Sequence, residues 1–327
     1  MLYLGIDIGA TKTAVCIGER DGRIRVSERI PTEGHRDADL YFRRLFPLCR
    51  KLVSQVDIPF ENIDAIGIGA PGPVDVANGI ILESPNMTGW HNVPVVARVE
   101  EAFGRPVLMN NDANAGVLAE YHFGAHRGTR NIVYLTHSTG MGGGIIANGR
   151  LLQGVSDTGG EVGHQILDPD GPPCECGLRG CFEAYCGGLS VANQIRARIR
   201  DESVHTRILE LVDGDVDRID FKVFVQAARD ADSFALAAWE QYLERLAQGV
   251  GNLIMILNPE VIILGTIATQ TGAFLMDPLR EKVRRYAWEW PLDACTIDTS
   301  SLGGQIGDLG ALAVALGSGE KRREKKP

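Results

Sequence analysis

The chain has 327 residues and a formal net charge of −9, with 33 Lys and Arg against 42 Asp and Glu. This length suits about two domains, and 44% hydrophobic with 23% charged residues excludes a disordered chain. The negative balance argues against nucleic acid as a partner. No basic leader precedes the first strand, and no apolar run reaches the roughly 18 residues of a membrane span. We therefore expect a cytoplasmic globular protein.

The first third of the chain alternates short apolar strands with helices. The pattern predicts strands over residues 2–9, 13–20 and 21–30, with a turn at Asp21-Gly22. It then predicts, in order, a helix over 38–55, a strand over 65–70, a helix over 94–103, a strand over 106–112 and a helix over 113–125. Such alternation indicates an α/β fold.

Residues 131–155 repeat the opening pattern of strand, Gly-rich loop, strand, turn and strand. This indicates two similar halves, although a chance pairing of Gly-rich hairpins gives the same pattern. Helices are expected over 190–202, 223–231 and 233–257, the last ended by Asn258-Pro259. A strand over 260–265, another helix and the segment 308–319 complete the fold, and the basic residues 320–327 are expected to be a solvated tail.

Two Gly-rich turns, residues 7–13 (DIGATKT) and 138–144 (STGMGGG), occupy equivalent places in the two halves. Gly beside Thr or Ser lets backbone N–H groups approach phosphate oxygens. Neither turn fits the P-loop or dinucleotide pattern, and a tight hairpin explains one such turn equally well. Together they could hold one polyphosphate. Asp7 could reach a phosphate-bound Mg²⁺ through water, or it could cap its own turn.

Asp112 stands between a predicted strand and a predicted helix. A carboxylate at that position could be the helix N-cap. It could equally accept the proton of a substrate hydroxyl. The local sequence does not separate these two roles.

Three cysteines and one histidine lie within eighteen residues: His164, Cys174, Cys176 and Cys181. One imidazole and three thiolates form a closed tetrahedral zinc site, with no open position for a catalytic water. Unliganded cysteines are the alternative. Cys186 also lies close and could replace a ligand, although it falls where a helix is expected to begin.

Glu161 and Glu183 flank this cysteine loop. Metal binding would hold both carboxylates beside His164, and such a ring of acceptors suits the hydroxyls of a sugar. Two solvated glutamates are the alternative.

These strings together resemble the ROK family (repressor, open reading frame, kinase), which contains sugar kinases and related regulators. The matching strings are LGIDIGATKT, GIGAPGPVD, SPN, GW, NNDANA, LTHSTGMGGGIIANGRLLQG, GGEVGH, CECGLRGCFEAY and LNPEVIILG. They follow the family order over nearly the whole chain, and GH…CxCGxxGCxE is highly specific. The resemblance implies the two-lobed actin-like (ribonuclease H-like) ATPase fold, with a cleft between the lobes.

The resemblance also implies roles for individual residues. Asp112 would be the catalytic base. The residues implied to bind the sugar are Gly72, Asn86, Asn111, Glu161, His164 and Glu183. Those implied to lie near ATP and Mg²⁺ are Asp7, Ala10, Thr11, Lys12, Thr139, Gly140 and Gly265. Structural Zn²⁺ would be held by His164, Cys174, Cys176 and Cys181, so that His164 serves two purposes.

The chain departs from the family pattern at three places on the nucleotide side. Ala10 replaces a Gly of the first loop, and Ser138 replaces a Gly of the second. Thr266 and Ile267 follow EVIILG, where the family typically has a second and often a third Gly. We expect a modest change in nucleotide affinity and a narrower nucleotide pocket.

The implied reaction is transfer of the γ-phosphoryl group of Mg-ATP to the 6-hydroxyl of a hexose. Glucose is the first choice, because GIGAPGPVD, SPN and NNDANA look most like the glucokinase branch. Fructose, mannose, allose, N-acetylglucosamine and N-acetylmannosamine remain alternatives, as does an inactive sugar-binding protein. A repressor is not expected, because such relatives carry a winged helix-turn-helix ahead of the kinase-like body and this chain begins at the first ATP-loop strand.

The resemblance finally implies a domain division and an assembly. The N-terminal lobe would span 1–111 and be joined by a C-terminal helix over 307–318. The C-terminal lobe would span 112–306 and carry the zinc loop and a dimerisation surface. A homodimer or a dimer of dimers is expected.

Overall fold

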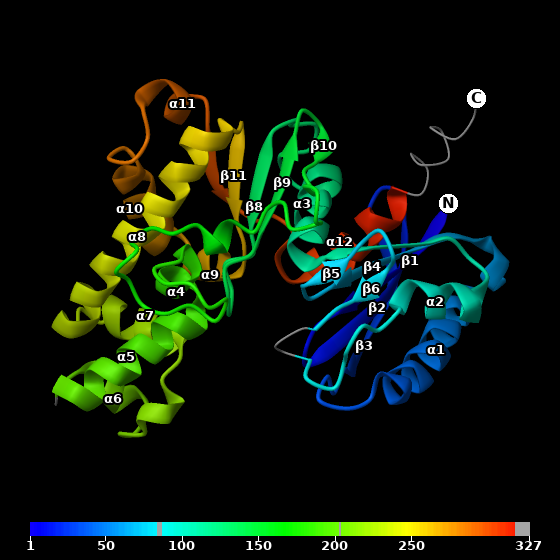
Figure 1. The fold of residues 1–327 in the computed structure, drawn as a ribbon, viewed down its shortest axis with the longest axis horizontal. Helices are drawn as coiled ribbons and strands as arrows, with labels where there is room; N and C mark the ends of the chain where they lie inside the picture. Colours follow the sequence, from blue (N-terminus) through cyan, green and yellow to red (C-terminus); the bar gives the residue numbers. More distant parts are fainter. Residues whose placement is uncertain (84–86, 203, 318–327) are drawn as a thin grey trace. The chain divides into compact units, whose positions relative to one another are not determined.

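The computed structural model describes residues 1–83, 87–202 and 204–317 (Figure 1). The predicted basic tail lies outside these residues. Contacts divide the chain into two compact units. Unit 1 comprises Met1–Thr129, Gly144–Gly160 and the described residues from Ser301 onward, and unit 2 comprises Arg130–Gly143 and Glu161–Ser300. This grouping differs from a boundary after residue 111, because the helix Asp112–Phe123 packs on the helix Ile306–Leu316 within unit 1.

Unit 1 is built on a five-stranded sheet of order β3-β2-β1-β4-β7. The first three strands form the predicted antiparallel meander, and β4 and β7 continue the sheet parallel to β1. Their bounds are β1 Leu2–Ile8, β2 Lys12–Glu19, β3 Ile24–Pro31, β4 Ile63–Ala70 and β7 Val107–Asn111. In a parallel sheet the carboxyl ends of the strands share one edge, where ligands of α/β proteins commonly bind. Asp7 and Asn111 therefore lie at the same edge.

Helices cover both faces of this sheet. Because side chains alternate along a strand, Leu4, Ile6 and Ile8 face one core while Tyr3 faces the other. The first face carries α1 (Ala38–Gln55) and α2 (Val95–Phe103), and the second carries α3 (Asp112–Phe123) and α12 (Ile306–Leu316). Shorter elements of unit 1 are η1 (Phe60–Asn62), β5 (Val74–Asp75), β6 (Ile80–Ile81), β10 (Arg150–Leu151) and η4 (Gly303–Gln305).

Helix α12 lies unusually close to the sheet. A Cβ at Gly67 of β4 would come within 2.0 Å of the Ala311 carbonyl oxygen. Only glycine leaves room for backbone at this distance. The close approach brings the start of α12 against the carboxylate of Asp7, as described below.

A second five-stranded sheet, of order β10-β9-β8-β11-β12, repeats the topology of the first. Its β10–β9 pair is antiparallel, β8 and β12 both run parallel to β11, and the strand order matches that of the first sheet, so the predicted duplication is confirmed. Its remaining strands are β8 (Ile132–Leu135), β9 (Gly143–Ala147), β11 (Val261–Leu264) and β12 (Thr296–Thr299). Strand β11 corresponds to the predicted strand at 260–265, whereas β12 was not predicted.

The helices of unit 2 gather around α8 (Ser233–Leu257), which contacts α4, α7 and α10. Helix α8 has the predicted bounds, and Asn258 ends it in the left-handed conformation (φ 43°) before Pro259. The other helices are η2 (Val162–His164), α4 (Phe182–Cys186), α5 (Gly188–Glu202), α6 (Arg207–Leu211), η3 (Val216–Arg218), α7 (Phe221–Arg229), α9 (Thr266–Thr271), α10 (Ala273–Val283) and α11 (Glu289–Asp293).

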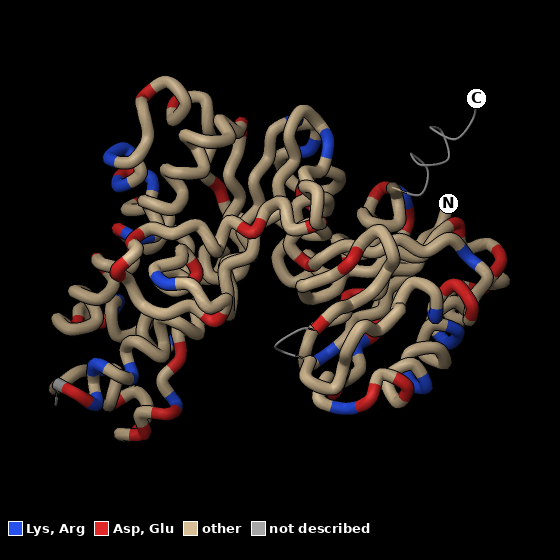
Figure 2. Tube along the Cα trace, viewed as in Figure 1, with Lys and Arg blue, Asp and Glu red and all other residues tan. Residues whose placement is uncertain are grey.

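Charged residues of both signs are interspersed, for example around α1 and around α5 and α6 (Figure 2). Among the described residues, no helix has the length and apolar character that crossing a bilayer requires.

Candidate active site

Asp7 lies at the carboxyl end of β1, on the face covered by α12. Its carboxylate packs against the backbone of Gly307, where a Cβ would come within 2.1 Å of Oδ2. The pKa of Asp7 is raised to about 7, mainly by burial and further by the carboxylates of Asp112 and Asp308. The structure thus brings Asp7 and Asp112 together, in a cluster of carboxylates whose repulsion a divalent cation would relieve.

Asp308 belongs to this cluster, although the sequence analysis did not identify it. Its side chain is buried on α12, accepts a hydrogen bond from Ser27 Oγ at 2.9 Å and lies 3.6 Å from the Arg29 guanidinium. Its sequence context, an acidic residue in an Ala- and Gly-rich helix, carried no signal of proximity to Asp7.

The strand β7 passes directly into α3 at Asn111 and Asp112. The structure shows that Asn111, not Asp112, is the N-cap: its backbone is extended and its Oδ1 accepts the Asn114 N–H at 2.7 Å. Asn110 supports the turn, since its Oδ1 accepts the Asn111 N–H at 3.0 Å. If Asp112 were the N-cap, α3 would begin at Ala113. The helix instead begins at Asp112. Capping does not account for the Asp112 carboxylate.

The first Gly-rich turn is a tight hairpin connection. The Gly9 N–H donates to the Lys12 carbonyl at 3.1 Å, while Thr11 and Lys12 are exposed. The half-buried Ala10 packs against the core of unit 1, so its additional methyl group is accommodated by that core. Gly72 follows β4, and a Cβ there would meet no atom within 4 Å. Asn86 lies outside the described residues.

The predicted metal ligands come together in unit 2. The ligand atoms of His164, Cys174, Cys176 and Cys181 all lie within 4.8 Å of one another. Cys176 Sγ is 3.7 Å from Cys181 Sγ, and Cys174 Sγ is 3.7 Å from His164 Nδ1. Sulfur atoms around a tetrahedral zinc with Zn–S bonds of 2.3 Å are about 3.8 Å apart. The donor set and its spacing therefore fit zinc.

Cys186 is not part of this cluster. Its buried Sγ lies 4.0 Å from the Tyr242 carbonyl oxygen on α8. The alternative in which Cys186 replaces a metal ligand is therefore wrong, because α4 points this thiol into the helical core.

Glu161 and Glu183 lie beside His164, as the sequence predicted. Burial raises the pKa of Glu161, with an opposing effect of His164 and a further increase from Glu183, which shows that the three groups are neighbours. His164 turns Nδ1 toward the cysteines, so Nε2 lies on the opposite side of its ring. Glu183 Oε2 also accepts the Met141 N–H at 2.7 Å, which joins this group to the second Gly-rich loop.

The second Gly-rich loop is held through its carbonyl groups. Gly188 N–H donates to Ser138 O and Leu189 N–H donates to Thr139 O, both at 2.9 Å. The N–H groups of Thr139 and Gly140 donate no hydrogen bond to any residue that the structure describes. Successive backbone N–H groups that point the same way can bind an anion, so these two N–H groups are candidates for contacting phosphate.

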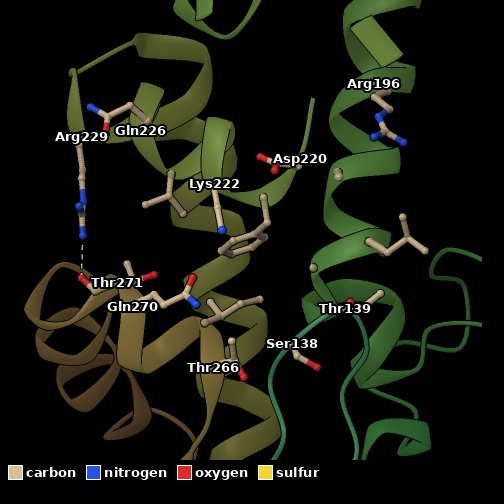
Figure 3. A pocket seen from close by; sticks show the side chains of 16 residues that line it. Ser138, Thr139, Arg196, Asp220, Lys222, Gln226, Arg229, Thr266, Gln270 and Thr271 are labelled. Carbon is tan, nitrogen blue, oxygen red and sulfur yellow. Dashed lines mark hydrogen bonds between the residues drawn. The ribbon is translucent and has the colours of Figure 1, made fainter. Parts of the chain in front are cut away.

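A pocket of about 690 Å³ adjoins this loop. Lys222 of α7 and Gln270 of α9 point into it from facing helices, and Ser138, Thr139 and Thr266 lie along one edge (Figure 3). The lining also includes the apolar side chains of Leu189, Ala192, Phe221, Val225 and Ile267. A pocket lined by apolar side chains with several polar groups among them suits a flat heterocyclic base.

The two departures after β11 lie in this pocket. Thr266 and Ile267 both line it. Gly265 precedes them, and a Cβ there would come within 2.4 Å of the Thr136 carbonyl oxygen, so Gly265 is required by the backbone packing. Sequence reasoning missed Lys222 and Gln270, since a single polar residue on an amphipathic helix carries no signal of a pocket.

Comparison with known proteins supports the family resemblance. A glucokinase of Thermotoga maritima is 35% identical over 95% of this chain and 96% of its own length. A xylose repressor of Caldicellulosiruptor bescii is 30% identical over 96% of this chain, which spans 77% of the repressor. The crystal structure of a ROK family glucokinase from Streptomyces griseus, in complex with glucose and AMPPNP, matches with a TM-score of 0.78 and 32% identity over 97% of this chain and 99% of that chain.

The duplicated sheets have the topology expected of the actin-like ATPase fold, which this chain shares with the ROK sugar kinases. The ROK family model matches residues 3–318. The chain belongs to the ROK family.

Proposed function

We propose that this protein is an ATP-dependent hexose kinase, with glucose as the first candidate acceptor and its 6-hydroxyl as the phosphorylated group. The observation that carries the proposal is the joining of Glu161, His164 and Glu183 to a loop with unused backbone N–H groups. The candidate sugar-binding residues are thus linked to the candidate phosphate loop through the hydrogen bond from Met141 N–H to Glu183. The similarity to glucokinases supports the same assignment.

The acceptor side uses hydrogen bonds to vicinal hydroxyls. Glu161 and Glu183 offer carboxylate oxygens, and His164 offers Nε2 because its Nδ1 faces the cysteines. Zn²⁺ held by the three thiolates and Nδ1 would supply structural rigidity, which orients the imidazole and lowers the entropy lost when sugar binds. Asn111 is a further candidate for contacting the sugar, since its own capping bond orients its amide.

In the chemical step, Asp112 accepts the proton of the reacting hydroxyl as the phosphoryl group is transferred. Enzymatic phosphoryl transfer depends mostly on positioning and on charge stabilisation. Asp7 and its neighbouring carboxylates fit Mg²⁺, which would neutralise phosphate charge when bound. Asn111 is the N-cap of α3, so the base role proposed for Asp112 does not compete with capping.

The donor side consists of the Thr139 and Gly140 N–H groups and the adjoining pocket. The N–H groups would bind phosphate oxygens, and the pocket would take the adenosine moiety between its apolar side chains. Thr11 and Lys12 of the first turn are exposed and are further candidates for contacting phosphate. We further propose a homodimer as the working assembly.

A panel of sugars separates the candidate activities. Zinc-replete protein is incubated with Mg-ATP and each of glucose, mannose, fructose, allose, N-acetylglucosamine and N-acetylmannosamine, and ADP release is followed. The proposal predicts sugar-dependent ADP release that is largest with glucose. Release with another hexose alone would reassign the acceptor. Sugar binding without ADP release from any acceptor would instead indicate an inactive or regulatory member of the family.

A further inference from the structure

A fully buried histidine begins the second Gly-rich loop. His137 has a positive φ of 42°, a conformation uncommon for residues other than glycine. Its Nε2 lies 2.6 Å from Tyr242 Oη of α8, and its carbonyl accepts the Ile267 N–H at 2.8 Å. The residue therefore connects the loop to two different helices.

The other ring nitrogen of His137 has no partner. Nδ1 is buried and forms no hydrogen bond within the part of the chain that the structure describes. A buried polar atom without a partner and a strained backbone both cost stability. Such costs cluster at functional sites, and here they occur directly before Ser138 and Thr139.

Tyr242 extends the connection to the pocket wall. Its ring stacks on Trp239 at 5.0 Å and lies edge-on to Phe221 at 5.3 Å. Phe221 lines the pocket that adjoins the loop. One tyrosine thus contacts both the residue that begins the phosphate loop and an aromatic wall of the base pocket.

We propose that His137 and Tyr242 form a positioning pair. The pair fixes the position of the phosphate loop relative to the base pocket, so that both can contact the same phosphoryl donor. This inference rests on the proposed kinase function. Neither residue is among those that line the pocket. Its hydrogen bond fixes where the loop starts, and hence where the Thr139 and Gly140 N–H groups point. The pair should therefore affect donor binding and leave acceptor binding unchanged.

Tyr242→Phe removes one hydroxyl and keeps the ring. Binding of AMPPNP with Mg²⁺, and separately of glucose, is measured by calorimetry on this variant and on the wild type. We expect AMPPNP binding to weaken about five- to tenfold, in keeping with the loss of one buried hydrogen bond, and glucose binding to be unchanged. In turnover, the KM for ATP should rise more than kcat falls.

Tyr286→Phe is the matched control. Tyr286 also donates its hydroxyl to a residue of α8, Glu244, and does not line the pocket. This variant should bind AMPPNP like the wild type. If Tyr242→Phe does not fold, His137→Asn serves instead, because asparagine tolerates a positive φ but is too short to reach Tyr242.

The outcomes separate this inference from the proposed function. A folded Tyr242→Phe or His137→Asn variant with wild-type AMPPNP affinity would overturn the positioning role, as would an equal loss of glucose affinity. A wild-type protein that binds no nucleotide would instead overturn the kinase assignment and, with it, this inference.

Discussion

The two units carry different parts of the proposed chemistry. Unit 1 presents carboxylates at the edge of a parallel sheet, with Asp7 raised in pKa by burial beside Asp112. Unit 2 presents hydrogen-bonding groups fixed by a cysteine cluster and by a loop tied through its carbonyls. The first arrangement suits proton and phosphate chemistry, whereas the second suits recognition. Substitutions in unit 1 should therefore lower kcat, and substitutions in unit 2 should raise KM values.

The largest effect is expected in unit 1, from Asp112→Asn. Removing the base should lower kcat at least about 100-fold while glucose affinity changes little. The substitution preserves shape, and the cap of α3 remains because Asn111 provides it. Steady-state kinetics and glucose calorimetry on the same sample check this expectation. Turnover near that of the wild type would remove Asp112 from the mechanism.

The next largest effect tests whether the cysteine cluster serves sugar recognition. Cys176→Ser, or removal of metal by a chelator, should release His164 and raise the KM for glucose at least about tenfold. The half-exposed thiol of Cys295 lies outside the cluster, so Cys295→Ser is the control. Metal content is measured on each sample. Suppose that the wild type holds stoichiometric zinc and that the KM for glucose is unchanged after the zinc is lost. The cluster would then have no role in sugar binding.

Gly140→Ala tests whether the phosphate loop and the carboxylate of Glu183 act together. A Cβ at position 140 would come within 2.5 Å of Glu183 Oε2, so this carboxylate must shift. We expect the KM for glucose to rise about five- to tenfold, together with a rise in the KM for ATP. Gly304→Ala is the control, because a Cβ there meets no atom within 4 Å. An effect on ATP alone would show that Glu183 does not bind the sugar.

A smaller effect is expected from Lys222 at the donor pocket. The side chain points into the pocket, and an exposed ammonium attracts phosphate only weakly through solvent (Figure 3). Lys222→Met should raise the KM for ATP about threefold and leave the KM for glucose unchanged. Lys51→Met, which removes a surface ion pair between Lys51 of α1 and Glu28 of β3, should change neither value. Equal kinetics for both variants would remove Lys222 from donor binding.

The smallest effect concerns stability rather than kinetics. Burial lowers the pKa of His137 to about 3, whereas an unfolded histidine titrates near 6.5. Between these pH values the unfolded chain binds more protons, so the stability that His137 contributes at neutral pH is lost as the pH falls, by up to about 1.4 kcal/mol per unit. His137→Asn should show a shallower loss between pH 7 and 5 in urea unfolding. Parallel losses in both proteins would contradict a buried, neutral His137.

Local patterns predicted the regular elements well. Apolar periodicity and the Asn258-Pro259 stop gave the bounds of α8, and repeated hairpins indicated the duplicated sheets. Strand β12 was missed because only one of its four residues, Ile297, is a buried hydrophobic side chain. A short strand at a sheet edge has too little periodicity to be recognised.

Sequence also predicted the ligand cluster, because cysteine spacing is a local property. It could not predict which residue caps α3, since Asn111 and Asp112 are equally good caps and the turn geometry decides between them. The sequence did not identify Asp308, Lys222 or Tyr242 as site residues, for a different reason. Each reaches its site from a distant helix, and only tertiary packing brings it there.

The most direct test of the central claim is phosphorus NMR of the product formed from glucose, Mg-ATP and zinc-replete protein. The account predicts a phosphomonoester resonance coupled to the two C6 protons of the sugar, and loss of that signal with Asp112→Asn. Absence of any phosphorylated hexose from a protein that binds both glucose and AMPPNP would contradict it.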